Sequence, residues 1–199
     1  MNKLFLFCLL AVAHVGMAQT SVSNPAPTSS LALKLPQLDK SPMDMAYYPV
    51  NYPVLKIQDK LTEPLVARVI YSRPQKDGRT IFGGLIEYGQ VWRLGANEAT
   101  EIELYKDVKV KDKKLGKGRY SIFAVPTETS WTIIFNKDTD VWGAFKYEEK
   151  KDVLRVNVPV QKTDVVVEPF TISFVKSATG ADMILAWDEA MVTVPLTFK

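Results

Sequence analysis

The chain has 199 residues, and its 25 basic and 22 acidic side chains give a formal net charge of +3 at pH 7. The basic residues are scattered and form no stripe with stacking aromatic side chains, which argues against a nucleic-acid-binding protein. Cys8 is the only cysteine and His14 the only histidine. A chain that loses residues 1–18 therefore lacks the groups needed for disulfides, for Ser-His-Asp or Cys-His catalysis and for a usual zinc site.

Residues 1–18 have the pattern of a secretory signal peptide. Lys3 precedes an apolar run of about ten residues, and Gly16 and Ala18 supply the small side chains of a cleavage site. The run is too short for a permanent membrane span, and Cys8 lies inside it, unlike the cysteine of a lipoprotein anchor. We predict cleavage after Ala18 and export to the periplasm or beyond.

Two segments without clear periodicity follow. Residues 19–40 are rich in Ser, Thr and Pro, which predicts a flexible leader before a single domain at 41–199. Residues 41–56, SPMDMAYYPVNYPVLK, mix three prolines with three tyrosines. Because proline disrupts helices and central strands, we predict an extended segment here, with its tyrosines covering an edge or groove of the domain.

From residue 65 onward, apolar and polar side chains alternate with the period of two that is typical of β-strands. WTIIF at 131–135 is apolar on both faces, which indicates a central strand, and KVKDKK at 109–114 indicates a solvated hairpin tip. Strands are predicted at 65–71, 100–105, 118–125, 131–135, 153–160, 169–174, 183–187 and 190–198. About eight or nine strands with short joints predict an all-β fold, an antiparallel β-sandwich or a flattened barrel.

Two neighbouring stretches allow a functional and a structural interpretation. NKDTD at 136–140 lacks the glycine and the distal glutamate of a calcium loop, so we expect a turn whose asparagine supports its own backbone. VWGAFKY at 141–147 places Trp142, Phe145 and Tyr147 around Gly143. These aromatic side chains form either a platform for sugar rings or, as is more common, a cap on the core.

VWRLGANEAT at 91–100 interrupts the alternation with polar side chains around a glycine. In one interpretation Glu98 is buried and paired with an arginine, which braces the long excursion at 73–100. In the other, the excess of arginines leaves a pocket for a small anionic or carbohydrate ligand. The candidate ligand-binding residues are Arg73, Arg79, Trp92, Arg93, Asn97, Glu98 and Thr100.

Longer stretches carry a family resemblance. They read YSRPQKDGRTIFGGLIEYGQVWRLGANEATEI, GKGRYSIFAVP, WTIIFNKDTDVWGA and DVLRV, and they resemble a bacterial family known as domain of unknown function 2911 over nearly all of 41–199. The matched signature residues are Arg73, Pro74, Gly78, Arg79, Phe82, Gly83, Trp92, Arg93, Gly95, Ala96, Asn97, Glu98 and Thr100. The resemblance implies a secreted bacterial domain and supplies no catalytic residues.

Together these patterns predict a non-catalytic binding or structural module of the cell envelope, without cofactor or metal, with its polar site at the arginine, asparagine and glutamate cluster. The alternative is a carboxylate-dependent hydrolase acting on a glycoside. Such an enzyme needs two facing carboxyl groups about 5 to 9.5 Å apart. Glu98 would supply one, and Glu101, Glu168 or Asp188 the other.

Overall fold

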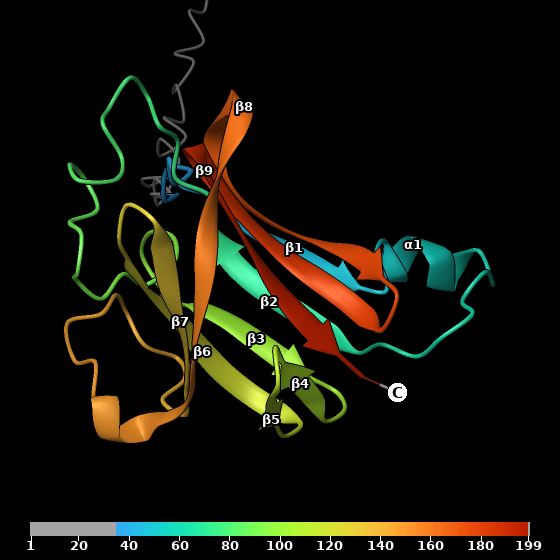
Figure 1. Ribbon diagram of the computed structural model, residues 1–199. Helices are drawn as coiled ribbons and strands as arrows, with labels where there is room; N and C mark the ends of the chain where they lie inside the picture. Colours follow the sequence, from blue (N-terminus) through green and yellow to red (C-terminus); the bar gives the residue numbers. More distant parts are fainter. Residues whose placement is uncertain (1–34, 199) are drawn as a thin grey trace, which may run out of the picture. The chain divides into compact units, whose positions relative to one another are not determined.

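Nine strands form one antiparallel sheet in the computed structural model, in the order β1-β2-β3-β6-β7-β8-β9-β4-β5 (Figure 1). The sheet folds over on itself in a sandwich-like manner and is not closed into a barrel, which confirms the all-β prediction. The structure describes residues 35–198. The predicted signal peptide and residues 19–34 of the predicted leader lie outside this range, and the fold below concerns the unit that begins at Leu38.

The strands are joined by short turns except for three long connections, at 49–66 between β1 and β2, at 73–99 between β2 and β3 and at 137–151 between β7 and β8. The strands are β1 (Met43–Tyr48), β2 (Ala67–Ser72), β3 (Thr100–Leu104), β4 (Val108–Val110), β5 (Lys113–Leu115), β6 (Gly118–Pro126), β7 (Ser130–Asn136), β8 (Asp152–Ser177) and β9 (Gly180–Thr197). Within residues 35–198 the helical elements are α1 (Tyr52–Ile57) and one 3-10 turn, η1 (Glu149–Lys151). No helix in this range is long and apolar enough to cross a membrane.

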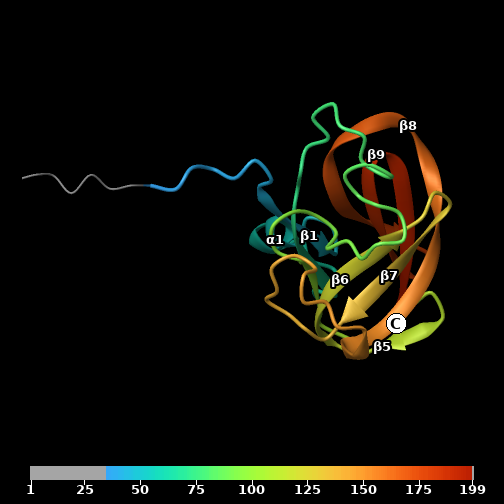
Figure 2. The ribbon, with the colours of Figure 1, turned by 90° about the vertical axis from the view of Figure 1, so that its left-hand side faces the viewer.

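β8 belongs to both layers of the folded sheet. Its first part pairs with β7, and from Val160 onward it pairs with β9, with register shifts between Lys162 and Thr171. Bulges of this kind bend a strand and increase its twist, and Figure 2 shows β8 curving from the layer of β6 and β7 toward β9. The strands predicted separately at 153–160 and 169–174 are thus parts of one strand.

The same holds for β9, where the predicted strands at 183–187 and 190–198 are continuous. Asp188 has a positive φ of 55° and opposes Val167 at the bulge. The interruption of the alternating pattern near residue 188, which suggested two separate strands, is therefore a bend within one paired strand.

Alternate side chains of the two layers fill the space between them. Rings pack across the gap, as in the edge-to-face pairs of Tyr48 with Phe174 and of Tyr71 with Phe170. The excursion after β2 carries Ile81 and Phe82 to the core, where Phe82 contacts Trp92 and Trp131. β7 is buried on both faces, with Ile133 and Phe135 in the main core and Ile134 in a second cluster on the opposite face. This confirms the central strand.

The segment 41–56 is extended only in part, and the expectation that its prolines prevent a regular strand or helix was wrong, because it holds β1 and α1. Pro42 and Pro49 lie just outside β1, which is an edge strand of the sheet. Pro53 lies in the first turn of α1, where its missing N–H would be unpaired in any case. The β4–β5 hairpin, in contrast, confirms the predicted turn at 109–114.

Candidate functional site

The polar stretch 91–100 and the aromatic stretch 141–147 lie against each other through their backbones. The amide of Gly143 donates to the carbonyl of Asn97 over 2.9 Å, and the amide of Ala99 donates to the carbonyl of Val141 over 3.0 Å. Between these bonds, Glu98 and Trp142 form an isolated antiparallel bridge. Two regions that the sequence suggests as separate sites therefore form one two-loop unit.

The 91–100 stretch is an excursion from an otherwise continuous strand edge. Trp92 exchanges both backbone hydrogen bonds with Ala124 of β6, at 2.7 and 2.8 Å, and the amide of Thr100 donates to the carbonyl of Arg93 over 3.0 Å. The chain thus leaves the sheet after Arg93 and returns at Thr100. The residues between them project toward the aromatic stretch.

Trp92 and Thr100 hold this excursion from the inside. The indole of Trp92 is buried in the core and donates to the carbonyl of Gly95 over 3.2 Å. The buried hydroxyl of Thr100 donates to the carbonyl of Leu94. Gly95 has a φ of 146°, and a β-carbon there would come within 2.9 Å of the carbonyl oxygen of Ser72. These residues of the candidate set shape the loop and are not open to a ligand.

A small apolar layer joins the loops to the face of the sheet that is turned away from the main core. Phe123 and Ile134 of the sheet pack there with Ala99, and Tyr147 is among the partly buried residues against them. The rings of Phe123 and Tyr147 meet edge to face with centroids 5.1 Å apart. Tyr147 therefore caps this face, whereas Trp142 and Phe145 are 61% and 84% exposed.

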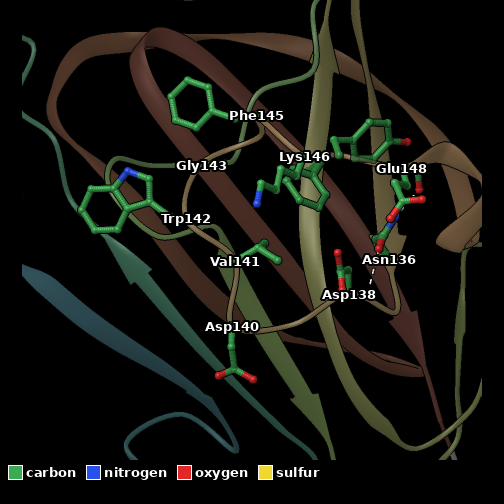
Figure 3. A pocket seen from close by; sticks show the side chains of 11 residues that line it. Asn136, Asp138, Asp140, Val141, Trp142, Gly143, Phe145, Lys146 and Glu148 are labelled. Carbon is green, nitrogen blue, oxygen red and sulfur yellow. Dashed lines mark hydrogen bonds between the residues drawn. The ribbon is translucent and has the colours of Figure 1, made fainter.

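A cavity of about 440 Å³ opens at the 141–147 stretch, and none of its lining residues comes from 91–100 (Figure 3). It combines aromatic, acidic, amide and basic side chains from β6, from the end of β7 and from the loop that follows β7. The lining residues are Phe123, Asn136, Asp138, Asp140, Val141, Trp142, Gly143, Phe145, Lys146, Tyr147 and Glu148. We call this space the aromatic cavity. A concave, largely apolar site with a few polar groups is the usual form of a small-molecule site.

Hydrogen bonds fix the inner side of the aromatic cavity. The hydroxyl of Tyr147 donates to Asp152 and accepts from Arg155, both over 2.6 Å. Burial, followed by the bond to Asp152, raises the pKa of Tyr147 to about 12. The amide of Asn136 donates to Asp152 over 2.7 Å, and its oxygen accepts from the backbone of Asp138 over 2.8 Å. The last bond confirms the predicted self-supporting turn.

The carboxylates that line the aromatic cavity all have cationic partners. Asp138 pairs with Lys151 at 3.0 Å, and Glu148 pairs with Lys150 and Lys151 at 2.6 Å. The bonds to Lys150 and Lys151 lower the pKa of Glu148 to about 2. Asp140 pairs with Arg119, which lowers the pKa of the aspartate. A general acid requires a raised pKa, so Asp140 and Glu148 are suited to accept hydrogen bonds rather than to donate protons.

A comparison with known families matches a range of residues that covers this site. The family described as protein of unknown function (DUF2911) matches residues 55–196, which include both loops of the site. The chain belongs to this family. No curated protein and no solved structure matches the chain.

Two arginines of the candidate set form their hydrogen bonds elsewhere in the fold. Arg73 bonds to Asp44 at 2.9 Å, to Thr171 at 3.0 Å and to the carbonyl of Phe170 at 3.2 Å, and so connects β1 with β8. Arg79 donates to backbone carbonyls of its own loop, at residues 75 and 76. Neither side chain lines the aromatic cavity.

The interpretation of Glu98 as a buried partner of an arginine was wrong. Glu98 is exposed, and within residues 35–198 it forms no ion pair. Arg93 is half-buried, and its Nε has no hydrogen-bond partner in the described part of the chain. Burial lowers the pKa of Arg93.

The carboxylates proposed as partners of Glu98 in a hydrolase lie in different environments. Glu101 bonds to Arg119 and to the backbone of Asp140. Glu168 accepts from the amide of Asp77 over 2.7 Å, and Asp188 pairs with Lys76 at 3.0 Å. The side chains of these three residues do not line the aromatic cavity. In the described residues no group of three or more acidic, histidine or cysteine side chains is placed to hold a metal ion.

The sequence drew attention to 136–140 only as a possible calcium loop, and it did not point to the polar side chains that line the cavity. Asp138, Asp140, Lys146 and Glu148 come from stretches that otherwise read as an acidic turn and a solvated loop. Many charged residues flank the aromatic stretch, and this density could have indicated a binding site. An ordinary solvated loop has the same composition, however, so the signal is not specific.

Proposed function

We propose that this chain is a non-catalytic binding module that holds a sugar ring in the aromatic cavity. The observation that carries the proposal is the exposure of Trp142 and Phe145, at 61% and 84%, beside fixed hydrogen-bond acceptors. The C–H faces of a sugar ring are apolar and pack on aromatic rings, whereas its hydroxyl groups need polar partners at the edge. Exposed apolar groups that gather in one place generally mark a binding surface.

The carboxylates of the lining suit such a ligand because they are already oriented. Asp138, Asp140 and Glu148 each have an ion-pair partner, so their side chains lose less rotational freedom when a ligand binds. Each carboxylate has about four acceptor positions, and an ion pair leaves some of them free for sugar hydroxyl groups. Preorganised acceptors around an apolar platform provide orientation as well as affinity.

The proposal includes export to the cell envelope. Residues 1–18 have the charged start, short apolar run and small-residue site of a signal peptide. We expect the exported form to begin at Gln19. Intact-mass measurement on protein isolated from its native host checks this, and a mass that retains residues 1–18 would contradict the export model.

A glycan array followed by calorimetry tests the binding function. We expect the wild-type protein to bind a subset of saccharides, and Trp142→Ala and Phe145→Ala each to weaken binding about tenfold, equivalent to about 1.4 kcal/mol. Tyr105→Ala is the control, because Tyr105 is 40% exposed and does not line the cavity. Binding that both cavity variants retain, or no saccharide binding at all, would refute the function.

A further inference from the structure

The charged side chains that line the aromatic cavity are paired, with one exception. The three lining carboxylates, Asp138, Asp140 and Glu148, are matched by three cations that lie outside the lining, Arg119, Lys150 and Lys151. Lys146 also lines the cavity, and within residues 35–198 its ammonium group has no ion-pair or hydrogen-bond partner. Arg119 also pairs with Glu101, so the paired groups leave no positive charge in excess, and Lys146 is the one charged side chain of the lining without such a partner in the described residues.

Lys146 is placed where it can meet a substituent of a bound ring. It directly follows Phe145, and in Figure 3 its ammonium group extends among the side chains of the lining rather than away from them. Trp142 and Phe145 lie at the same opening. A ring packed on these aromatic side chains would exclude water near the ammonium group, and a charge pair is stronger where water is excluded.

From this arrangement we propose that the natural ligand is an acidic saccharide, whose negative substituent pairs with Lys146. The inference rests on the proposed sugar-binding function and specifies its ligand class. An ammonium group is a compact point charge with three donors, so it accepts either a carboxylate or a sulfate oxygen. The shared chemistry is a sugar ring with one anionic group, and uronic acids and sulfated sugars are its two sources.

A matched pair of ligands separates charge from shape. Oligogalacturonide and its methyl ester have the same rings and linkages, and only the former carries free carboxylates. We expect the chain without the predicted signal peptide, residues 19–199, to bind the acid about tenfold more tightly than the ester in calorimetry, with the difference shrinking as salt is added. A sulfated galactose oligosaccharide forms the second arm, and a preference for it over the oligogalacturonide identifies sulfate as the source of the charge.

Lys146→Gln should weaken binding of the acid about tenfold and so abolish the preference for the acid over the ester. Lys137→Gln is the matched control, because Lys137 is an exposed lysine of the same loop that does not line the cavity. Equal affinity for acid and ester in the wild-type protein overturns the inference but leaves sugar binding in place. If the array and all three ligands show no binding, the proposed function itself fails.

A membrane surface is the competing partner for exposed aromatic side chains next to a lysine. Vesicles of phosphatidylglycerol therefore form a further arm of the experiment. Binding to these vesicles that is lost in Lys146→Gln, without binding to any saccharide, overturns the acidic-sugar inference. Absence of vesicle binding together with the tenfold acid preference supports it.

Discussion

The ring of Phe145 rests on the α-carbon of Gly143, so closely that a β-carbon at position 143 would lie 2.7 Å from Cε2 of the ring. Gly143 also has a φ of 69°, in the left-handed region that favours glycine. Its amide forms one of the two hydrogen bonds that join the loops. One glycine thus fixes the loop path and leaves the space that an aromatic side chain of the cavity occupies.

Gly143→Ala should separate these two roles when it is compared with Gly78→Ala. Gly78 has the same φ of 69°, but a β-carbon there meets nothing within 4 Å. Both variants should lose about 1 kcal/mol of unfolding free energy, because an L-residue is strained in this conformation. Only Gly143→Ala should also weaken saccharide binding, because Phe145 must move. Chemical denaturation and calorimetry check both effects, and equal binding by the two variants would contradict the role of Phe145.

Trp142 should dominate fluorescence quenching by acrylamide. The chain has four tryptophans, and Trp92, Trp131 and Trp187 are at most 4% exposed, whereas Trp142 is 61% exposed. We expect Trp142→Phe to remove most of the accessible fraction, and a bound saccharide to protect it in the wild-type protein. An accessible fraction that persists in Trp142→Phe would show that another tryptophan is open to solvent.

Glu98→Ala should change the free energy of unfolding by no more than about 0.5 kcal/mol, as is usual for exposed positions. Glu101→Ala is the contrasting variant, because its side chain is 12% exposed and bonds to Arg119 and to the backbone of Asp140. We expect it to cost about 1 to 2 kcal/mol, a value reduced from that of a buried charged hydrogen bond because Arg119 is half exposed. Urea denaturation checks both, and a large loss for Glu98→Ala would restore the bracing interpretation.

Tyr147 should make folding stability fall at alkaline pH. Its folded pKa of about 12 lies above the ordinary value of 10.0, because burial and the bond to Asp152 favour the neutral phenol. The stabilisation is fully present below pH 10 and is lost as the pH rises from 10 toward 12. Tyr147→Phe should lose less stability across this interval than the wild-type protein, as measured by denaturation at each pH. Identical pH profiles would contradict the raised pKa.

Arg73→Lys should destabilise the protein although it conserves the charge. Three nitrogen atoms of Arg73 bond to Asp44, Thr171 and the carbonyl of Phe170, and a lysine cannot reproduce this planar arrangement. We expect a loss of about 1 to 3 kcal/mol. Arg79→Lys is the control, with a change within about 0.5 kcal/mol, since Arg79 is exposed and, within residues 35–198, its side chain bonds only to carbonyls of its own loop. Similar melting curves for the two variants would contradict the difference.

The sequence predicted those parts of the fold that local alternation determines. In β3, Ile102 and Leu104 are buried and Glu101 and Glu103 are not, as the period of two requires. It could not predict that β8 continues beyond Val160 and through Pro169, because a proline within a strand and a proline at a break look alike until the pairing partner is known. The same limitation concealed β1, whose edge position makes its flanking prolines harmless.

The candidate site was predicted in pieces. Both loops are distinctive in their residue types, but the hydrogen bond between Gly143 and Asn97 joins positions far apart in the chain, and no local pattern in the sequence predicts it. The arginines were grouped because they are close in sequence. The fold separates them, since Arg73 turns to β8 and Arg79 to its own loop, while the loop after β7 supplies the lysine and the acids of the cavity.

The two loops are held together by main-chain atoms at 97–99 and 141–143, and these bonds do not depend on which side chains the loops carry. Substitutions at Trp142, Phe145 or Lys146 can therefore accumulate without separating the loops, provided that Gly143 is kept. The nine-stranded sheet beneath does not have to change when the lining does. Related chains could thus diversify in what they bind by exchanging a few exposed residues on an unchanged frame, in the way that antibody domains vary their binding loops.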